Sequence, residues 1–213
     1  MNSRPMFPLG AVLLPGEPLD LRVFEPRYVQ LLRDVRAGVV PPEFGVVLIE
    51  RGHEVGGGDQ RAAVGVLAEI ERMSELSPDR FALTCRGTDR FRVRRWLPDD
   101  PYPRAELEFW PDSTDIAEQD DAQALAHVHA NLAVVAELAG RLAERQGAPA
   151  PSVGLLDLLP ADPVARSYLV TARVPLATAD RYAALSAIGP VDRLSRVASA
   201  LDDVAAALRF QLQ

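Results

Sequence analysis

The segment MFPLGAVLLPGEPLDLRVFEPRY, from Met6 to Tyr28, sets the architecture of the first half of the chain through its prolines and apolar residues. Proline fixes φ and donates no backbone hydrogen bond, so Pro8, Pro15 and Pro18 predict bends or strand ends. The residues after Pro18 alternate between apolar and charged side chains, which is typical of a strand with one buried face. The segment therefore predicts architecture that builds a surface rather than a set of reactive groups.

The last residues of this segment, FEPRY, predict a corner between a strand and a helix. Pro26 suits the first position of a helix and Gly38 suits its end, so we expect a helix between them. Glu25 is expected to cap this helix. We expect Phe24 to close the strand on the core and Tyr28 to face the sheet.

Short β-like runs continue to about residue 112. FGVVLIE is a continuous apolar run that predicts a buried strand, and VGVLAEIE places alternate apolar residues on one face. Further separate strands are expected from RFALTCRG, RFRVRRW and RAELEFW. These five runs occupy residues 44–50, 64–71, 80–87, 90–96 and 104–110.

Beyond residue 112 apolar residues recur at spacings of three and four, which predicts amphipathic helices. The two most regular series are Leu125, Val128, Leu132, Val135, Leu138 and Leu142 in a long helix, and Leu194, Val197, Leu201, Val204 and Leu208 in a last helix. Asp162 and Thr178 are expected as N-caps, and Gly189 with Pro190 separates the last two helices.

The two patterns together predict an α+β protein. We expect a β-rich domain with one helix over residues 1–112, followed by a helical bundle over residues 113–213. The sequence GAPAPS predicts a linker near residues 147–152 inside the second domain.

The composition limits the classes of function. The 213 residues are 48% hydrophobic and 25% charged, with a net charge of -7, which favours a well-cored protein with little general attraction to nucleic acid or anionic membranes. The N-terminus lacks the pattern of a signal peptide, and no apolar run is long enough to span a membrane, so we expect a cytoplasmic protein. All 23 basic residues are arginine, which excludes P-loop, Ser-Lys and Schiff-base chemistry within these residues.

Several motifs that carry chemistry elsewhere favour a structural interpretation here. His127 and His129 are two residues apart on a predicted helix and cannot share a metal, while His53 and Cys85 are isolated in the sequence. APSVG, residues 150–154, lacks the strand before its serine that a nucleophile elbow needs, and the glycine-rich residues 52–65 precede a strand rather than a helix. We therefore expect no catalytic residues, no metal and no cofactor, and hence no enzyme.

The arginines of the run from residue 86 to residue 95 form the densest charge cluster. On a strand, Arg90, Arg92 and Arg94 share one face and Phe91 takes the other. One hypothesis is an anion- or RNA-binding face. The favoured interpretation is a solvated face whose arginines pair with acids on neighbouring strands.

The order of the motifs resembles a known family. FPLGAVLLPGEPLDLRVFEPRYVQLLRD resembles the opening of the Lon protease N-terminal substrate-binding domain, and VGVLAEIERM, CRGTDRFRVRRW and YPRAELEFW follow the pattern of that family. DPVARSYLVTARVPLATADRYAALSAIGPVDRLSRV is similar to the helical segment that follows. The resemblance implies a PUA-like β-barrel followed by helices, in a stand-alone form without the ATPase and protease modules.

The resemblance also implies the partners, which are unfolded or tagged polypeptides and a separate protease or chaperone. Such a protein needs an apolar groove or a free sheet edge. We expect Val12, Leu13 and Leu14 to supply it, with Arg27 and Tyr28 beside them. The leading hypothesis is thus a non-enzymatic polypeptide-binding module that acts as an adaptor in protein quality control. The alternative is an RNA- or nucleotide-binding PUA-like module.

Overall fold

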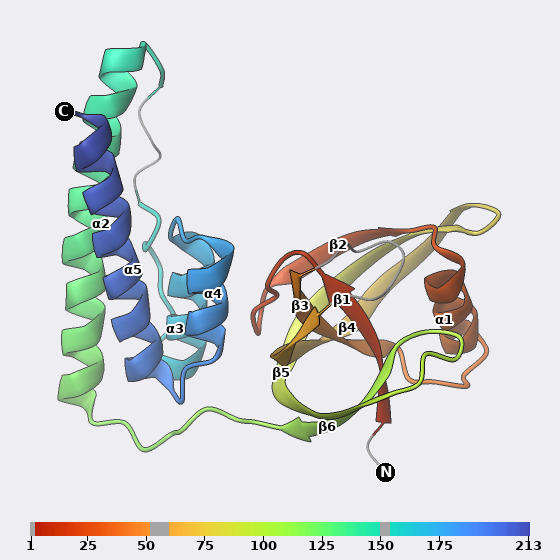
Figure 1. The fold of residues 1–213 in the computed structure, drawn as a ribbon. Coiled ribbons are helices and arrows are strands. Elements are labelled where there is room, and N and C mark those ends of the chain that lie inside the picture. The colour runs from red at the N-terminus through yellow and green to blue at the C-terminus, as the bar shows by residue number, and fades with distance from the viewer. Residues whose placement is uncertain (1–2, 52–59, 150–153) are drawn as a thin grey trace. The chain divides into compact units, whose positions relative to one another are not determined.

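The computed structural model describes residues 3–51, 60–149 and 154–213, which form two compact units (Figure 1). The β-rich half ends at Pro111, and the helical half comprises Asp112–Gln213. Their elements in chain order are β1 (Ser3–Leu9), β2 (Pro18–Val23), α1 (Pro26–Arg36), β3 (Glu43–Arg51), β4 (Gln60–Ser77), β5 (Arg80–Leu97), β6 (Arg104–Phe109), α2 (Glu118–Gln146), α3 (Pro163–Arg173), α4 (Thr178–Leu185) and α5 (Pro190–Gln211).

The β-rich half is built on one six-stranded sheet with the order β2-β5-β4-β3-β1-β6. β1 and β3 are parallel, and the other neighbouring strands are antiparallel. β6 pairs with β5 as well as with β1. The strands β5, β4, β3, β1 and β6 therefore form a closed circuit of pairings, and β2 lies outside that circuit. The α+β class expected from the sequence is confirmed.

One core of the β-rich half is enclosed by this circuit of strands. Its buried side chains are Met6, Val47, Leu67, Phe91, Ala105 and Leu107. Gly65 lies where β4 passes this core, and a Cβ there would overlap the Val46 carbonyl and the Phe91 ring. Glycine at this position therefore permits the close approach of β3 to β4.

The two runs expected as separate strands at residues 80–87 and 90–96 form the single strand β5. The sequence at their junction, Gly87-Thr88-Asp89, is typical of a turn. The chain stays extended there because Gly87 donates to Glu17 O at 2.9 Å and accepts from Gly16 N at 2.8 Å. A partner from another segment thus overrides the local preference for a turn.

The FEPRY corner forms, with two differences from expectation. α1 begins at Pro26 and ends before Gly38, whose φ of 72° suits glycine. Phe24 is 56% exposed rather than buried, because the preceding Val23 faces the core and neighbouring strand residues point to opposite faces. Glu25 occupies the N-cap position without a capping hydrogen bond, since its carboxylate accepts from Arg27 Nε at 3.1 Å.

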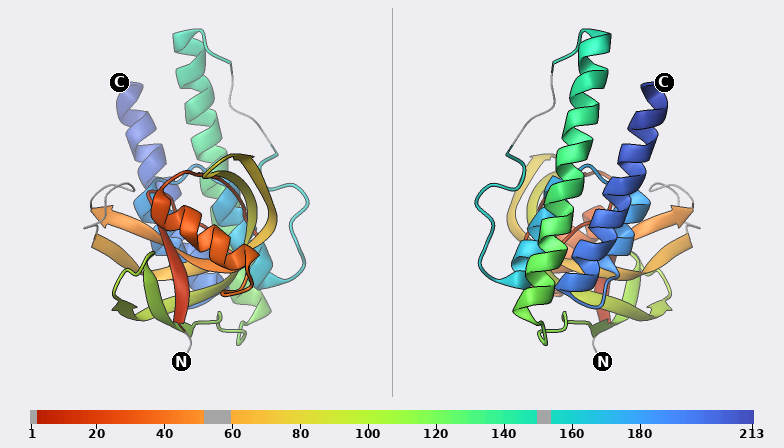
Figure 2. Two further views of the ribbon diagram at one scale, coloured as in Figure 1. Left: turned by 90° about the vertical axis from the view of Figure 1, so that its right-hand side faces the viewer. Right: turned by 90° about the vertical axis from the view of Figure 1, so that its left-hand side faces the viewer.

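The helical half has its own apolar core. α2 and α5 are its two long helices and lie side by side (Figure 2), while α3 and α4 pack against α5. Leu194, Val197 and Leu201 are fully buried, and both expected stripes belong to one apolar cluster. Within the described residues, none of the helices combines the length and apolar character that a membrane span requires.

The helix starts follow the sequence except at α4. Asp162 caps α3 by accepting from Ala165 N at 2.7 Å, and Gly189 precedes α5. The expectation that Thr178 is an N-cap is wrong, because the helix already includes Thr178 and Ala177 holds the cap position without a side-chain bond. Threonine tolerates the first helical turn, so the residue type alone left its position uncertain by one.

Arg193 lies fully buried in the helical half and joins four segments. Its guanidinium donates to Asp112 Oδ1 at 2.6 Å, to Ser167 Oγ at 2.8 Å and to Ala184 O at 3.1 Å. It also lies over the Tyr168 ring, 3.6 Å from the ring centroid. These bonds fix the start of the helical half against α3, α4 and α5.

We predict that Leu201→Ala destabilises the helical half by about 2–5 kcal/mol, because the truncation removes buried apolar contacts and leaves a cavity. Phe210→Ala is the matched control, since Phe210 is a large apolar residue of the same helix with 76% exposure. Its loss should stay within about 0.5 kcal/mol. Urea unfolding followed by circular dichroism measures both, and equal losses in the two variants would contradict the packing described.

Candidate functional site

The loop between β1 and β2 holds the three residues expected to bind peptides. Val12, Leu13 and Leu14 are 7%, 5% and 0% exposed. The Leu14 carbonyl and the Leu13 side chain lie directly over Gly87, where a Cβ would collide with them. The three side chains therefore belong to the core, and their role in binding a peptide stays a prediction.

Arg27 and Tyr28 shape the FEPRY corner. The Tyr28 ring is buried and stacks on Phe7, with a centroid separation of 3.9 Å and an interplanar angle of 12°. The Arg27 guanidinium lies 4.6 Å from the centroid of the same ring and pairs with Glu25 at 3.1 Å. The stacking attaches α1 to β1, so both residues have a structural role in this arrangement.

Next to this loop lies the β2 edge, meaning the side of Pro18–Val23 that faces away from β5. β2 is the terminal strand of the sheet (Figure 1), and among the described strands it pairs with β5 alone. Leu19 and Leu21 are half-buried, and Asp20 and Arg22 on the opposite face are exposed. The β2 edge thus combines backbone groups at a sheet margin with partly covered apolar side chains.

The arginine row does not form a uniformly solvated face. Arg94 pairs with Glu108 at 3.0 Å, as the favoured interpretation expected, and the hydrogen bond from Arg94 lowers the pKa of the Glu108 carboxyl. Arg90 is only 4% exposed, and its Nε donates to Trp110 O at 3.0 Å. The expectation of a solvated row is therefore wrong for Arg90.

Trp110 accounts for this difference. It lies opposite Arg90 at the end of β6, and the guanidinium carbons of Arg90 and Arg92 are 4.0 Å and 3.5 Å from the centroid of its indole ring. RNA-binding sheets use aromatic faces for stacking on bases. Here two guanidinium groups lie against the indole.

The residues with potential for metal or thiol chemistry stay apart. Within the described residues, no group of three or more His, Cys, Asp and Glu side chains could hold a metal ion. Burial, with smaller contributions from Asp20 and Glu71, raises the pKa of the Cys85 thiol to about 12. His53, most of the glycine-rich run and Ser152 of the APSVG motif lie outside the described residues.

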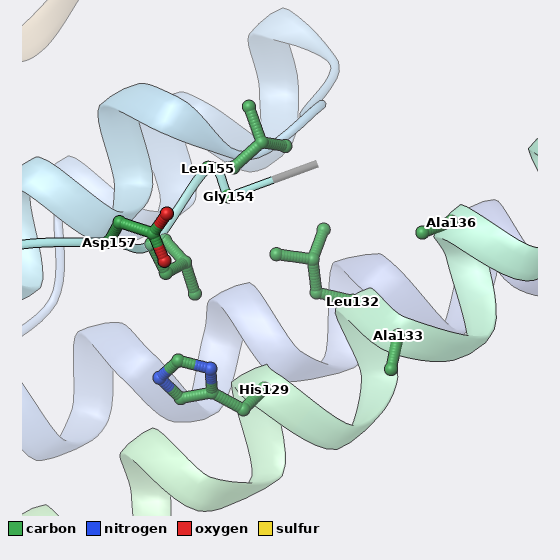
Figure 3. Close-up of a pocket in the computed structure, with 8 residues that line it drawn as sticks. His129, Leu132, Ala133, Ala136, Gly154, Leu155 and Asp157 are labelled. Carbon is green, nitrogen blue, oxygen red and sulfur yellow. The ribbon is translucent and has the colours of Figure 1, made fainter. Parts of the chain in front are cut away.

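The helical half contains a shallow hollow of about 260 Å³ between α2 and residues 154–157 (Figure 3). Its walls are mainly apolar, with Leu132 on α2 and Leu155 on the facing segment, while His129 and Asp157 supply the polar groups. Among the described residues that line it, none carries a hydroxyl or thiol. Sequence reasoning missed this hollow because its two walls are separated along the chain.

The fold resembles that of solved Lon N-terminal domains. The structure of a Lon N-terminal domain protein from Xanthomonas campestris gives a TM-score of 0.65 and 29% sequence identity, covering 93% of this chain and 98% of that chain. The N-terminal domain of the Lon protease from the Mycobacterium avium complex gives a TM-score of 0.60 at 15% identity, a likeness of fold alone that covers 94% of this chain and 98% of that chain.

Residues 3–203 match the family described as the ATP-dependent protease La (LON) substrate-binding domain, and the chain belongs to this family. Lon protease 2 of Sorangium cellulosum (strain So ce56) is 30% identical over 115 residues, which is 53% of this chain. Lon protease 2 of Myxococcus xanthus is 31% identical over 113 residues, which is 52% of this chain. The matched regions make up 14% and 13% of the lengths of these two relatives.

We predict a large difference between two arginines of the row. Arg90→Ala should cost about 1–3 kcal/mol, because it removes a buried donor to the Trp110 carbonyl. Arg92→Ala, on the same strand face but exposed, should cost less than about 1 kcal/mol. Urea unfolding followed by tryptophan fluorescence compares them, and equal losses would contradict the burial of Arg90.

We also predict that Cys85 is inert in the folded protein. A thiol with a pKa near 12 is almost fully protonated at pH 8, and the side chain is buried. Ellman's reagent should react slowly with the native protein and at once after denaturation. Fast stoichiometric reaction of the native protein would show that the thiol is accessible.

Proposed function

We propose that this chain binds polypeptide substrates through its β-rich half and performs no chemical step on them. The match of residues 3–203 to a substrate-binding domain carries the proposal. Within this proposal, the circuit of β-strands corresponds to the PUA-like β-barrel of the resemblance. The protein acts as an adaptor that passes unfolded or tagged polypeptides to a separate protease or chaperone.

The surface chemistry of the β-rich half supports binding of unfolded chains. Unfolded polypeptides differ from folded ones by exposed apolar side chains and free backbone groups. Phe24 and Leu76 are large apolar residues that are 56% and 53% exposed, and the β2 edge offers a sheet margin beside the loop of Val12–Leu14. The proposed contact near that loop therefore uses the β2 edge, because the loop side chains themselves are buried.

The test of the proposal compares how tightly this protein binds the unfolded and the folded form of one client. Fluorescent, reduced and carboxymethylated α-lactalbumin is titrated with this protein, with native α-lactalbumin as the matched control. We expect a Kd in the micromolar range, about -8 kcal/mol, for the unfolded form and binding at least about tenfold weaker for the native form. Absence of binding, or equal binding of both forms, would overturn the proposal.

A further inference from the structure

The geometry of β2 allows its free backbone groups to be assigned. The register with β5 is regular from Pro18 opposite Arg86 to Val23 opposite Phe81. In an antiparallel ladder, every second residue directs both its backbone N–H and C=O toward the partner strand. The remaining residues direct theirs away from it.

Two observations fix which residues face outward. Gly87 N donates to Glu17 O at 2.9 Å, so alternation makes Leu19, Leu21 and Val23 the residues whose backbone groups face β5. Pro18 has no N–H to donate, and proline within a sheet belongs on the side of an edge strand that faces solvent. Both observations leave the N–H and C=O groups of Asp20 and Arg22 directed outward.

The side chains of β2 separate into two faces. Leu19, Leu21 and Val23 point toward the core, and the first two are only half-buried. Asp20 and Arg22 point to the opposite face and are exposed. Directly opposite residues in neighbouring strands share a face of the sheet. A strand added at the β2 edge would therefore place every second side chain beside Leu19 and Leu21, on the same face.

We infer that the β2 edge takes up an extended polypeptide segment as an additional strand, a proposal that rests on the proposed function. The segment has apolar residues at every second position, which cover Leu19 and Leu21. The intervening residues are polar, with a basic residue opposite Asp20 and an acidic residue opposite Arg22 favoured by charge. The occupant is therefore an amphipathic β-forming segment of an unfolded protein, because in a folded domain such a segment is already hydrogen-bonded within a sheet.

The length and charges of β2 fit this occupant. The strand has six residues, which suits a short segment, and short edges with exposed charges resist pairing between two folded sheets. The edge can thus remain open in the free protein. An unfolded chain that supplies complementary charges satisfies both the backbone groups and the charged side chains.

The first test changes one outward backbone donor. Arg22→Pro removes the N–H that faces away from β5 and keeps the bonds of Leu21 and Val23 to β5. Arg22→Ala is the matched control, because it removes the same charge and keeps the N–H. The probe is a fluorescent peptide of about eight residues in which valine alternates with arginine, glutamate and threonine. We expect Arg22→Pro to weaken binding by about tenfold and Arg22→Ala to weaken it by less than about threefold.

The second test changes the peptide and leaves the protein intact. One peptide carries N-methyl groups on the valine amides, and a second carries them on the intervening amides. An added strand directs only one of these two sets toward β2, so one peptide should lose binding while the other retains it. This comparison decides the proposal even when Arg22→Pro does not fold.

The outcomes separate the two proposals. Strand addition is supported when only one of the two methylated peptides loses binding and Arg22→Pro binds the unmodified peptide more weakly than Arg22→Ala. Equal binding of both methylated peptides, equal loss in both, or normal binding by a folded Arg22→Pro overturns strand addition, while binding of unfolded α-lactalbumin keeps the proposed function. If the unmodified protein binds neither unfolded α-lactalbumin nor the peptide, both proposals fail.

Discussion

The need to hydrogen-bond β5 along both edges organises the β-rich half. β4 covers one edge from Arg80 to Arg92, and three separate segments share the other. β2 pairs with residues 81–86, the loop before β2 bonds to Gly87, and Trp110 and β6 complete the edge from Arg90 to Leu97. Because buried backbone groups are costly to leave unpaired, the long strand brings these distant segments together.

The same arrangement determines which apolar groups around β2 are accessible. The loop that contains Leu13 and Leu14 cannot swing outward without exposing its buried leucines and breaking its bonds to Gly87. β2 uses one edge for β5 and leaves the other at the margin of the sheet. The accessible apolar groups beside that margin are thus the partly covered leucines of β2, not those of the loop.

The helical half depends on a different interaction. A guanidinium in an apolar core is tolerated only when its charge and donors are satisfied. Arg193 meets this condition through Asp112, Ser167 and Ala184 and through the Tyr168 ring, while Tyr168 donates its hydroxyl to Asp112 at 2.7 Å. The network thus joins the start of the helical half, α3, α4 and α5 through directional hydrogen bonds that apolar packing does not supply.

The sequence by itself determined the features that are encoded by local periodicity and by single backbone restrictions. These include the alternation of Leu19, Leu21 and Val23, the buried stripe of α5, and the limits of α1 at Pro26 and Gly38. Tertiary structure alone decided the features that need two distant segments, because the neighbours of a residue in sequence do not reveal which segment packs against its side chain. Phe24 became exposed, Arg90 became buried beside Trp110, and residues 87–89 stayed extended rather than turning. The burial of Leu13 and Leu14, the outward groups of β2 and the network of Arg193 likewise depend on partners remote in the chain, whose hydrogen bonds and packing outweigh local preference.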